Sequence, residues 1–179
     1  MKAILFALTL IVTSCLYAED KSAQTASAPG CGPAEEKFDV NATKAQPGSA
    51  QLESGKALVY VIQDDNDFDS RPRPTSRIGV DGNWIGATRS NSYLRVAVDP
   101  GEHHLCASWQ GFVGFHMGIK MAALHFTAEP GKTYYFRVKD WSPGTVHGRM
   151  GEVEFQPLDS DEGQLLASKF SFATSTHKK

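Results

Sequence analysis

Short hydrophobic runs, separated by turn-forming residues, fill the middle of the chain. The first run, ALVYVIQ at 57–63, is apolar on both faces, which is typical of a central strand. Later runs mostly alternate, and in SYLRVAV at 92–98 every second residue is Leu or Val. The pattern predicts strands at residues 57–63, 76–80, 84–88, 92–98, 102–109, 121–128, 133–139 and 152–156.

The residues between these runs predict tight turns. Asp-Gly-Asn at 81–83 predicts a hairpin turn. Pro-Gly pairs at 100–101 and 130–131 have the composition of type II turns. Because no long helical period interrupts the strands, we expect an all-β fold, an antiparallel β-sandwich of about seven to eight strands.

The carboxyl end of the chain has a helical pattern instead. Asp159 is a candidate N-cap with a glutamate three positions later, the spacing of a capping box. Leu165, Leu166 and Phe170 suit one face of a short helix that packs on the sandwich. Gly163 weakens this helix by its low propensity. The sequence therefore predicts a short C-terminal helix beside the sheets.

The first eighteen residues predict an export signal, because Lys2 precedes an apolar run at 3–12 that is too short to span a bilayer. Cleavage after Ala18 is one interpretation. The other is a lipobox at 12–15, in which Cys15 is lipidated and anchors the mature chain. Both predict an exported protein in the periplasm or associated with the outer membrane. Only the second attaches it to the membrane, through the lipid on Cys15.

Composition divides the remaining chain into three parts. Residues 19–54 are rich in Ala, Ser, Gly and Pro and predict a flexible linker with a docked CGP segment at its centre. Residues 55–172 are the predicted β-sandwich domain, and the polar residues 173–179 are a predicted disordered tail.

Two cysteines, Cys31 and Cys106, remain outside the leader. An oxidising compartment favours a disulfide between them, and two unpaired thiols are the alternative.

Charge and motifs exclude several classes of function. The formal net charge of −2 gives no basic surface for nucleic acid. The sequence lacks a GxSxG nucleophile motif and a glycine-rich phosphate loop followed by Lys and Ser or Thr. We therefore expect a non-enzymatic protein without a cofactor.

The segment VDPGEHHLCASW contains the densest group of candidate metal ligands. His103 and His104 point to opposite faces of a strand, so they cannot bind one ion together. Glu102, His104 and Cys106 share a face and are a candidate zinc or copper site. Alternatively this face is polar and its cysteine is bonded to Cys31. The two interpretations exclude each other, because a bridged cysteine has no thiolate.

Two loops are candidate contact regions. In loop 64–74, Asp65 and Asp67 begin a calcium-like spacing, but the glycine and the closing glutamate of a calcium loop are absent. An acidic surface loop is the alternative. In loop 111–120, Phe112 and Phe115 form either an exposed apolar patch for a partner or the roof of a pocket.

Three stretches carry a resemblance to a known family: GKALVYVIQ, TSRIGVDGNWIGATRSNSYLRVAVDPGEHHLCA and FTAEPGKTYYFRV. They resemble an exported bacterial family called domain of unknown function 2846, which is similar to PEGA-type envelope β-domains. The likeness spans about residues 56–169 and depends on the turn-and-strand motifs at 81–82, 100–103 and 130–135. It implies an envelope β-sandwich and identifies no functional residue.

These observations predict a cell-envelope β-sandwich that acts as an interaction or structural module, with an envelope protein or a glycan as its partner. The alternative is a periplasmic protein that binds zinc or copper through His104 and Glu102.

Overall fold

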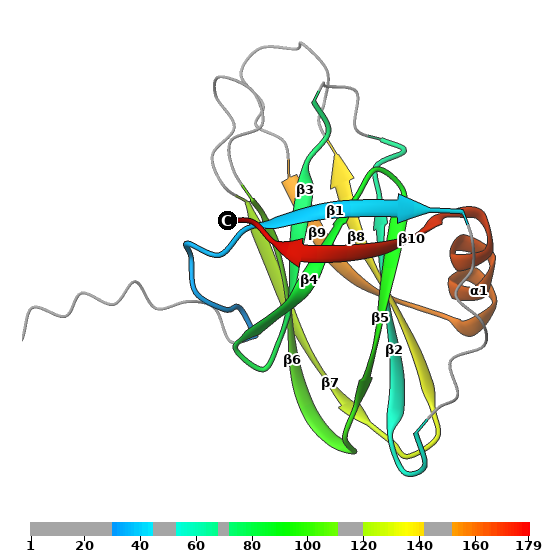
Figure 1. Ribbon diagram of the computed structural model, residues 1–179. Helices are drawn as coiled ribbons and strands as arrows, with labels where there is room; N and C mark the ends of the chain where they lie inside the picture. The colour runs from blue at the N-terminus through cyan, green and yellow to red at the C-terminus, as the bar shows by residue number, and fades with distance from the viewer. Residues whose placement is uncertain (1–29, 45–52, 68–71, 111–119, 142–151) are drawn as a thin grey trace, which may run out of the picture.

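The computed structural model describes residues 30–44, 53–67, 72–110, 120–141 and 152–179. Within these ranges the chain forms ten strands and one helix (Figure 1). They are β1 (Phe38–Thr43), β2 (Ala57–Asp64), β3 (Thr75–Val80), β4 (Asn83–Arg89), β5 (Ser92–Val98), β6 (Gly101–Trp109), β7 (Met121–Ala128), β8 (Thr133–Trp141), β9 (Glu152–Leu158), α1 (Ser160–Lys169) and β10 (Ser171–His177). All eight predicted strands are present, and β1 and β10 are additional.

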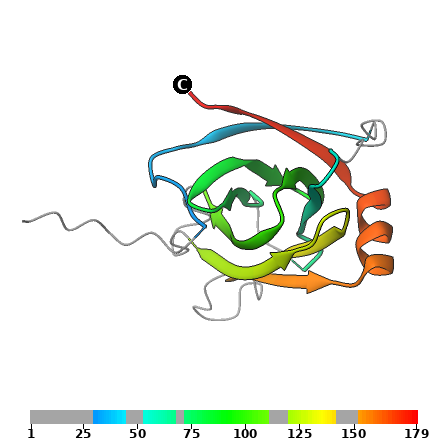
Figure 2. The same ribbon diagram turned by 90° about the horizontal axis from the view of Figure 1, so that it is seen from below.

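The strands form two sheets around one core, which confirms the predicted sandwich. The larger sheet has the strand order β1-β10-β5-β2-β8-β9, and the smaller has the order β4-β3-β6-β7. Most neighbouring strands are antiparallel, but β2 and β8 are parallel, as are β10 and β5. Seen from below, the sheets curl around the core, with β1 and β10 along one side and α1 on another (Figure 2).

The core consists of the inward residues of the alternating strands. Val59 and Val61 of β2 are fully buried and face Ile78 of β3 and Leu105 of β6 in the opposite sheet. Because strand side chains alternate between faces, a slip of one residue would move this whole set outward. The alternation read from the sequence therefore fixes which residues are buried.

Both chain segments that were predicted to lack regular structure contribute a strand. The predicted linker at 19–54 contains β1, and the predicted disordered tail at 173–179 is mostly part of β10. The two strands pair with each other along their whole length. Each supplies the main-chain hydrogen-bond partners that the other needs, so neither is recognisable from its local sequence. The predicted signal peptide, with Cys15, lies outside the described residues.

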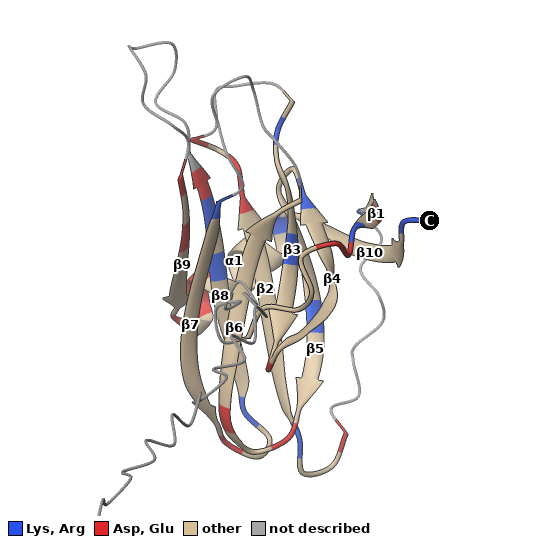
Figure 3. Ribbon diagram, turned by 90° about the vertical axis from the view of Figure 1, so that its left-hand side faces the viewer, with Lys and Arg blue, Asp and Glu red and all other residues tan. Residues whose placement is uncertain are grey.

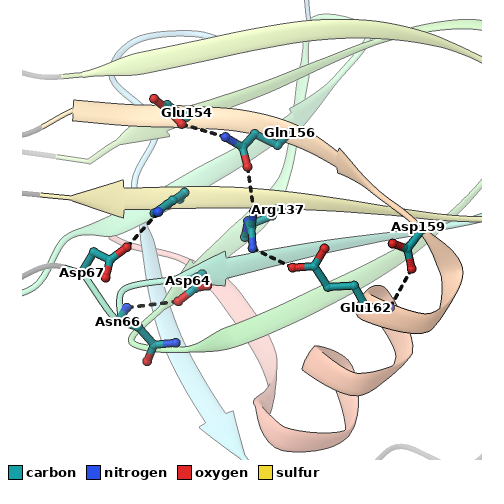
Figure 4. Close-up of polar contacts among 9 residues, drawn as sticks. Asp64, Asn66, Asp67, Arg137, Glu154, Gln156, Asp159 and Glu162 are labelled. Atoms are coloured by element: carbon teal, nitrogen blue, oxygen red, sulfur yellow. Dashed lines mark hydrogen bonds and ion pairs between the residues drawn. The ribbon is translucent and has the colours of Figure 1, made fainter.

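The helix α1 begins as the capping pattern predicts. Asp159 Oδ1 accepts a hydrogen bond from the backbone N–H of Glu162 at 2.9 Å. The Glu162 carboxylate does not complete a capping box, because it binds Arg137 Nη1 of β8 at 2.9 Å (Figure 4). Arg137 Nη2 also donates to Gln156 Oε1 of β9 at 2.8 Å. This cluster fastens α1 to the outer face of β8 and β9.

Gly163 lies where α1 crosses Tyr135 of β8. A Cβ atom at position 163 would overlap the ring of Tyr135. The residue that weakens the isolated helix therefore permits its close packing on the sheet. Leu166 belongs to the same hydrophobic cluster as Tyr135. Leu165, which was predicted to face the sandwich, is 50% exposed.

We expect Gly163→Ala to lower the free energy of unfolding by about 1–3 kcal/mol, because the added methyl group overpacks the contact with Tyr135. By helix propensity alone the same change would stabilise by about 1 kcal/mol. Urea denaturation measures the difference. Gln164→Ala, at an exposed helix position, is the control and should be neutral or stabilising. A stabilised Gly163→Ala variant would contradict the close packing.

Candidate interaction site

The ends of β2, β6 and β8 and the starts of β3, β7 and β9 lie at one end of the sandwich. In sequence, the connections β2–β3, β6–β7 and β8–β9 join these strand ends. Asp64 at the end of β2 lies opposite Lys139 near the end of β8. Ser76 at the start of β3 lies opposite Trp109 at the end of β6. We call this the network end. The other end, the turn end, carries the short β3–β4, β5–β6 and β7–β8 turns.

A buried hydrogen-bond network closes the core at the network end. Asp65 and Asp140 are fully buried, and their carboxyl groups share one hydrogen-bond donor, Gln63. Gln63 Nε2 donates to Asp65 Oδ1 at 2.9 Å and to Asp140 Oδ2 at 2.7 Å. Trp109 Nε1 donates to Asp140 Oδ1 at 2.8 Å. The network therefore links the ends of β2, β6 and β8.

The same network reaches two further segments. Gln63 Nε2 also donates to the carbonyl oxygen of Pro74, just before β3, at 3.0 Å. The backbone N–H of Ser90 donates to Asp65 Oδ2 at 3.1 Å, and Asn91 Oδ1 accepts from the backbone N–H of Asp65 at 2.8 Å. Ser90 and Asn91 form the tight β4–β5 turn with positive φ angles of 46° and 56°. One cluster thus fixes five segments of chain.

Two carboxyl groups buried around one amide donor favour the neutral form of one of them, because burial and mutual repulsion both oppose two negative charges. Burial, followed by the negative charge of Asp65, raises the pKa of Asp140 well above its ordinary value. Burial also raises the pKa of Asp65, although hydrogen bonds from Asp140 and Gln63 and the charge of Arg73 oppose this. The pair therefore keeps one proton, on Asp140, at pH values where a free aspartic acid is ionised.

The residues that were predicted to lie in contact loops have different locations in the structure. Asp65, predicted on a surface loop, is buried because it belongs to this network. Asp67 remains at the surface and pairs with Lys139 Nζ at 2.8 Å (Figure 4). Since the two carboxylates have separate partners, they do not form the beginning of a calcium loop. Phe112 and Phe115 lie outside the described residues.

Residues 30–38, which we call the strap, cross the outer face of β3, β4 and β6. Arg77 of β3 is 4% exposed, and its Nη1 donates to the carbonyl oxygens of Ala34 and Glu36, both at 2.8 Å. Arg77 Nη2 donates to Ser108 Oγ of β6 at 3.1 Å. The buried guanidinium therefore joins the strap to two strands.

Other contacts also bind the main chain of the strap. Trp84 Nε1 of β4 donates to the carbonyl oxygen of Pro33 at 2.7 Å. Gln110 accepts from the backbone N–H of Phe38 at 2.9 Å and donates to its carbonyl oxygen at 2.6 Å. The face of β3, β4 and β6 thus recognises the strap by its backbone.

A disulfide between Cys31 and Cys106 fastens the strap to β6, as predicted. Their Cα atoms are 5.1 Å apart, and both residues are buried. The docked CGP segment covers Cys106 and Ser108, so the predicted polar face of β6 is exposed only towards the turn end, at Glu102 and His104. The bridged Cys106 is not available as a metal ligand.

His103 joins two turns at the turn end. Its Nδ1 lies 2.6 Å from Asp81 Oδ2, and its Nε2 lies 2.7 Å from the carbonyl oxygen of Asp99. Both partners are acceptors, so both ring nitrogens carry hydrogen in the imidazolium form. Burial opposes this charge, but the bonds to Asp99 and Asp81 outweigh it and raise the pKa of His103.

We expect the His103 imidazole to titrate above its ordinary value in an NMR experiment, and Asp81→Asn to lower this pKa because it removes the carboxylate. The imidazolium stabilises the fold below the ordinary histidine pKa, and this contribution is lost as the pH rises through the folded value. Glu102→Gln, a carboxylate removed from the neighbouring position, is the control. An unchanged His103 titration in Asp81→Asn would contradict the assigned contact.

His104 lies on the opposite face, as the strand alternation predicts. It lies directly across from His125 of β7, with ring centroids 6.2 Å apart. Glu102 Oε1 lies 3.9 Å from His104 Nε2. Among the residues that the structure describes, no group of three or more His, Cys, Asp or Glu is placed to hold a metal ion. His125 thus lies next to the predicted pair of Glu102 and His104, but the three residues do not form a complete metal site.

Sequence reasoning missed the residues that build the network end and the face of β3, β4 and β6 under the strap. Gln63, Trp109 and Asp140 each stand at or near the end of a strand that reads as hydrophobic, and Arg77 stands inside one. In the sequence they are marked only by a polar group at a position where the alternation predicts a buried side chain. Which partners they meet depends on strand pairing across the chain.

No helix in the described part of the chain is long and apolar enough to cross a bilayer. In Figure 3, basic and acidic residues are interspersed along the strands.

The chain is similar to one known protein family. The model of that family, Protein of unknown function (DUF2846), matches residues 53–151. The chain belongs to the DUF2846 family. The search of curated proteins and the search of solved structures found no match. The likeness to PEGA-type domains and the bacterial origin stay predictions.

The DUF2846 match ends before the predicted limit at residue 169. It contains strands β2 to β8 and therefore the whole buried network of the network end. The strap, β1, β9, α1 and β10 lie outside it.

Proposed function

We propose that this protein is a non-enzymatic interaction module of the cell envelope and that the network end is its contact surface. The observation that carries the proposal is the buried cluster of Gln63, Asp65, Trp109 and Asp140. It lies at the ends of β2, β6 and β8, the strands after which the three connections begin. Loops on a rigid scaffold are the usual place for binding residues. The buried cluster supplies that rigidity.

The sequence of the β6–β7 connection suits a partner with apolar surface. The β6–β7 connection contains Phe112, Val113 and Phe115 within a glycine-rich stretch. Aromatic residues are enriched at interfaces and also stack on sugar rings, so an envelope protein or a glycan is the proposed partner.

Two features support the remaining parts of the proposal. The Cys31–Cys106 disulfide supports export to the periplasm or outer membrane, because disulfides persist in oxidising compartments. The acid pair of Asp65 and Asp140 supports a non-enzymatic role, since both carboxyl groups are fully buried and occupied by structural hydrogen bonds. Export by signal cleavage after Ala18 or by lipidation of Cys15 remains part of the proposal.

A binding experiment with surface variants tests this proposal. The double variant Phe112→Ser/Phe115→Ser should lose a partner that cross-links to the wild-type protein in envelope fractions. The controls are Ile85→Ser on β4 and Leu165→Ser on α1, which remove exposed apolar side chains elsewhere. Retention of the partner by the double variant, or its equal loss in the controls, would contradict the network end as the contact surface.

The cross-strand pair of His104 and His125 favours one second candidate, a site for zinc or copper. Opposed histidines on neighbouring antiparallel strands can approach one ion, and Glu102 stands beside His104. The ligands of this site would be the imidazoles of His104 and His125 and the carboxylate of Glu102. Cys106 is not a ligand, because it is bonded to Cys31.

Titration calorimetry of the untagged protein with Zn²⁺ or Cu²⁺ tests the second candidate. His125→Ala should weaken binding by about tenfold or more, which corresponds to 1.4 kcal/mol. His177→Ala, another histidine near the protein surface, is the control. Equal affinities of the two variants would eliminate the site.

A further inference from the structure

The strap groove, defined as the outer face of β3, β4 and β6 under residues 30–38, binds a peptide rather than a set of side chains. Its donors Arg77, Trp84 and Gln110 all bond to main-chain carbonyl oxygens of the strap. The Arg77 guanidinium also lies over the Trp84 ring, 4.5 Å from its centroid. Such preset donors recognise an extended chain in a fixed register.

The backbone of the strap lies so close to the groove at some positions that only glycine fits there. A Cβ at Gly32 would lie 2.6 Å from Trp84 Cδ1, and a Cβ at Gly30 would lie 2.7 Å from the carbonyl oxygen of His104. On the groove side, a Cβ at Gly79 would overlap the carbonyl oxygen of Gly30. The groove therefore fits a segment with glycine at two alternate positions, here Gly30 and Gly32.

We infer that this groove accepts residues 30–38 from a second copy of the chain, so that two copies exchange straps and each Cys31 bonds to Cys106 of the other copy. A second copy is the partner that the page supports, since it carries the required Gly-Cys-Gly-Pro sequence and the matching cysteine. The inference goes beyond the proposed function, because strap exchange does not involve the network end.

Reciprocal exchange retains every contact of the closed monomer. The strap leads directly into β1, which pairs only with β10 at the edge of the larger sheet. Residues 30–43 can therefore move as one unit onto the groove and β10 of another copy, and exchange of an identical element costs little. Closure within one copy is favoured at low protein concentration, and exchange is favoured at high concentration.

The covalent step balances with a small-molecule disulfide as the oxidant. Cys106 of one copy and Cys31 of the other each lose a hydrogen atom as the S–S bond forms, in two thiol–disulfide exchange steps. The oxidant takes up two electrons and two protons and leaves as two thiols. Docking of the strap sets which two cysteines meet.

Isotope mixing tests the inference with the wild-type groove intact. Equal amounts of ¹⁴N and ¹⁵N full-length protein, both carrying Cys15→Ser to prevent unrelated bridges, are unfolded, reduced and refolded together with glutathione and its disulfide. Mass spectrometry then measures Cys31–Cys106 peptide pairs that contain one light and one heavy partner.

We expect the mixed Cys31–Cys106 pair to increase with protein concentration and to exceed the mixed Cys31–Cys31 pair by about tenfold or more, which corresponds to 1.4 kcal/mol of docking preference. Gly32→Val should abolish this excess because it collides with Trp84, whereas Ala34→Val, which adds bulk at an exposed position, should retain it. No mixed Cys31–Cys106 pair at any concentration, or no excess over the Cys31–Cys31 pair, would overturn the inference.

Discussion

Removal of the Cys31–Cys106 disulfide is expected to lower the free energy of unfolding by about 4 kcal/mol, because the bridge closes a loop between residues 75 positions apart. The double variant Cys31→Ala/Cys106→Ala and the reduced wild-type protein should behave alike. Urea denaturation at fixed pH measures the effect.

The hydrogen bonds to the strap determine how much structure the protein keeps when the disulfide is broken. Arg77 and Gln110 still bond to the strap backbone, so the reduced protein should fold with the strap docked and unfold at lower urea concentration. Cys15→Ala is the control, because Cys15 has no role in this bridge. A loss below about 1 kcal/mol would show that loop closure contributes far less than the chain-entropy model predicts.

A rise in pH is expected to destabilise the protein through the buried acid pair. In the unfolded chain Asp65 and Asp140 ionise at ordinary values, whereas in the folded chain one proton stays on Asp140. The folded state therefore binds one more proton, and the free energy of unfolding falls by about 1.4 kcal/mol per pH unit across this window.

The direction of this effect follows from the raised pKa. The stabilising contribution is complete below the ordinary aspartate pKa and is lost as the pH rises through the folded pKa of the pair. Urea denaturation between mildly acid and mildly alkaline pH measures the slope. Asp140→Asn should flatten it, because the neutral amide removes the shared proton.

Asp67→Asn is the matched control for the acid pair. It removes a carboxylate from the same connection, but Asp67 lies at the surface and the charge of Lys139 lowers its pKa. Its slope over the same pH range should equal that of the wild-type protein. Equal slopes in Asp140→Asn and the wild-type protein would contradict a protonated pair.

The strands and the helix could be predicted because their signals are local. Alternation identified β2 to β9, and the Asp159 cap identified the start of α1. The opposite directions of His103 and His104 followed from the same period of two. The Cys31–Cys106 pairing followed from counting cysteines in a chain that is predicted to be exported.

The features that could not be predicted depend on contacts across the sequence. β1 and β10 lack a strong pattern and are strands because they pair with each other. Asp65 resembles its acidic neighbours in sequence, but Asp140, 75 positions later, makes it a buried residue. Gly163 reads as a helix breaker until Tyr135 is placed beneath it.

The two ends of the sandwich are built differently, and this contrast supports the proposed role. The turn end has short hairpins fixed by contacts such as His103 with Asp81. The network end joins longer connections to a buried polar cluster. Contacts at both ends thus stabilise the fold, and we propose the network end as the surface for a partner.

Site-specific photocross-linking in the cell envelope tests this assignment most directly. A photoreactive amino acid is placed at Phe115 in the β6–β7 connection or, as the control, at Lys132 in the β7–β8 turn. The proposed function predicts a discrete adduct from position 115 that is lost with Phe112→Ser and absent from position 132. Adducts from position 132 alone, or the same adducts from both positions, would contradict the network end as the interaction surface.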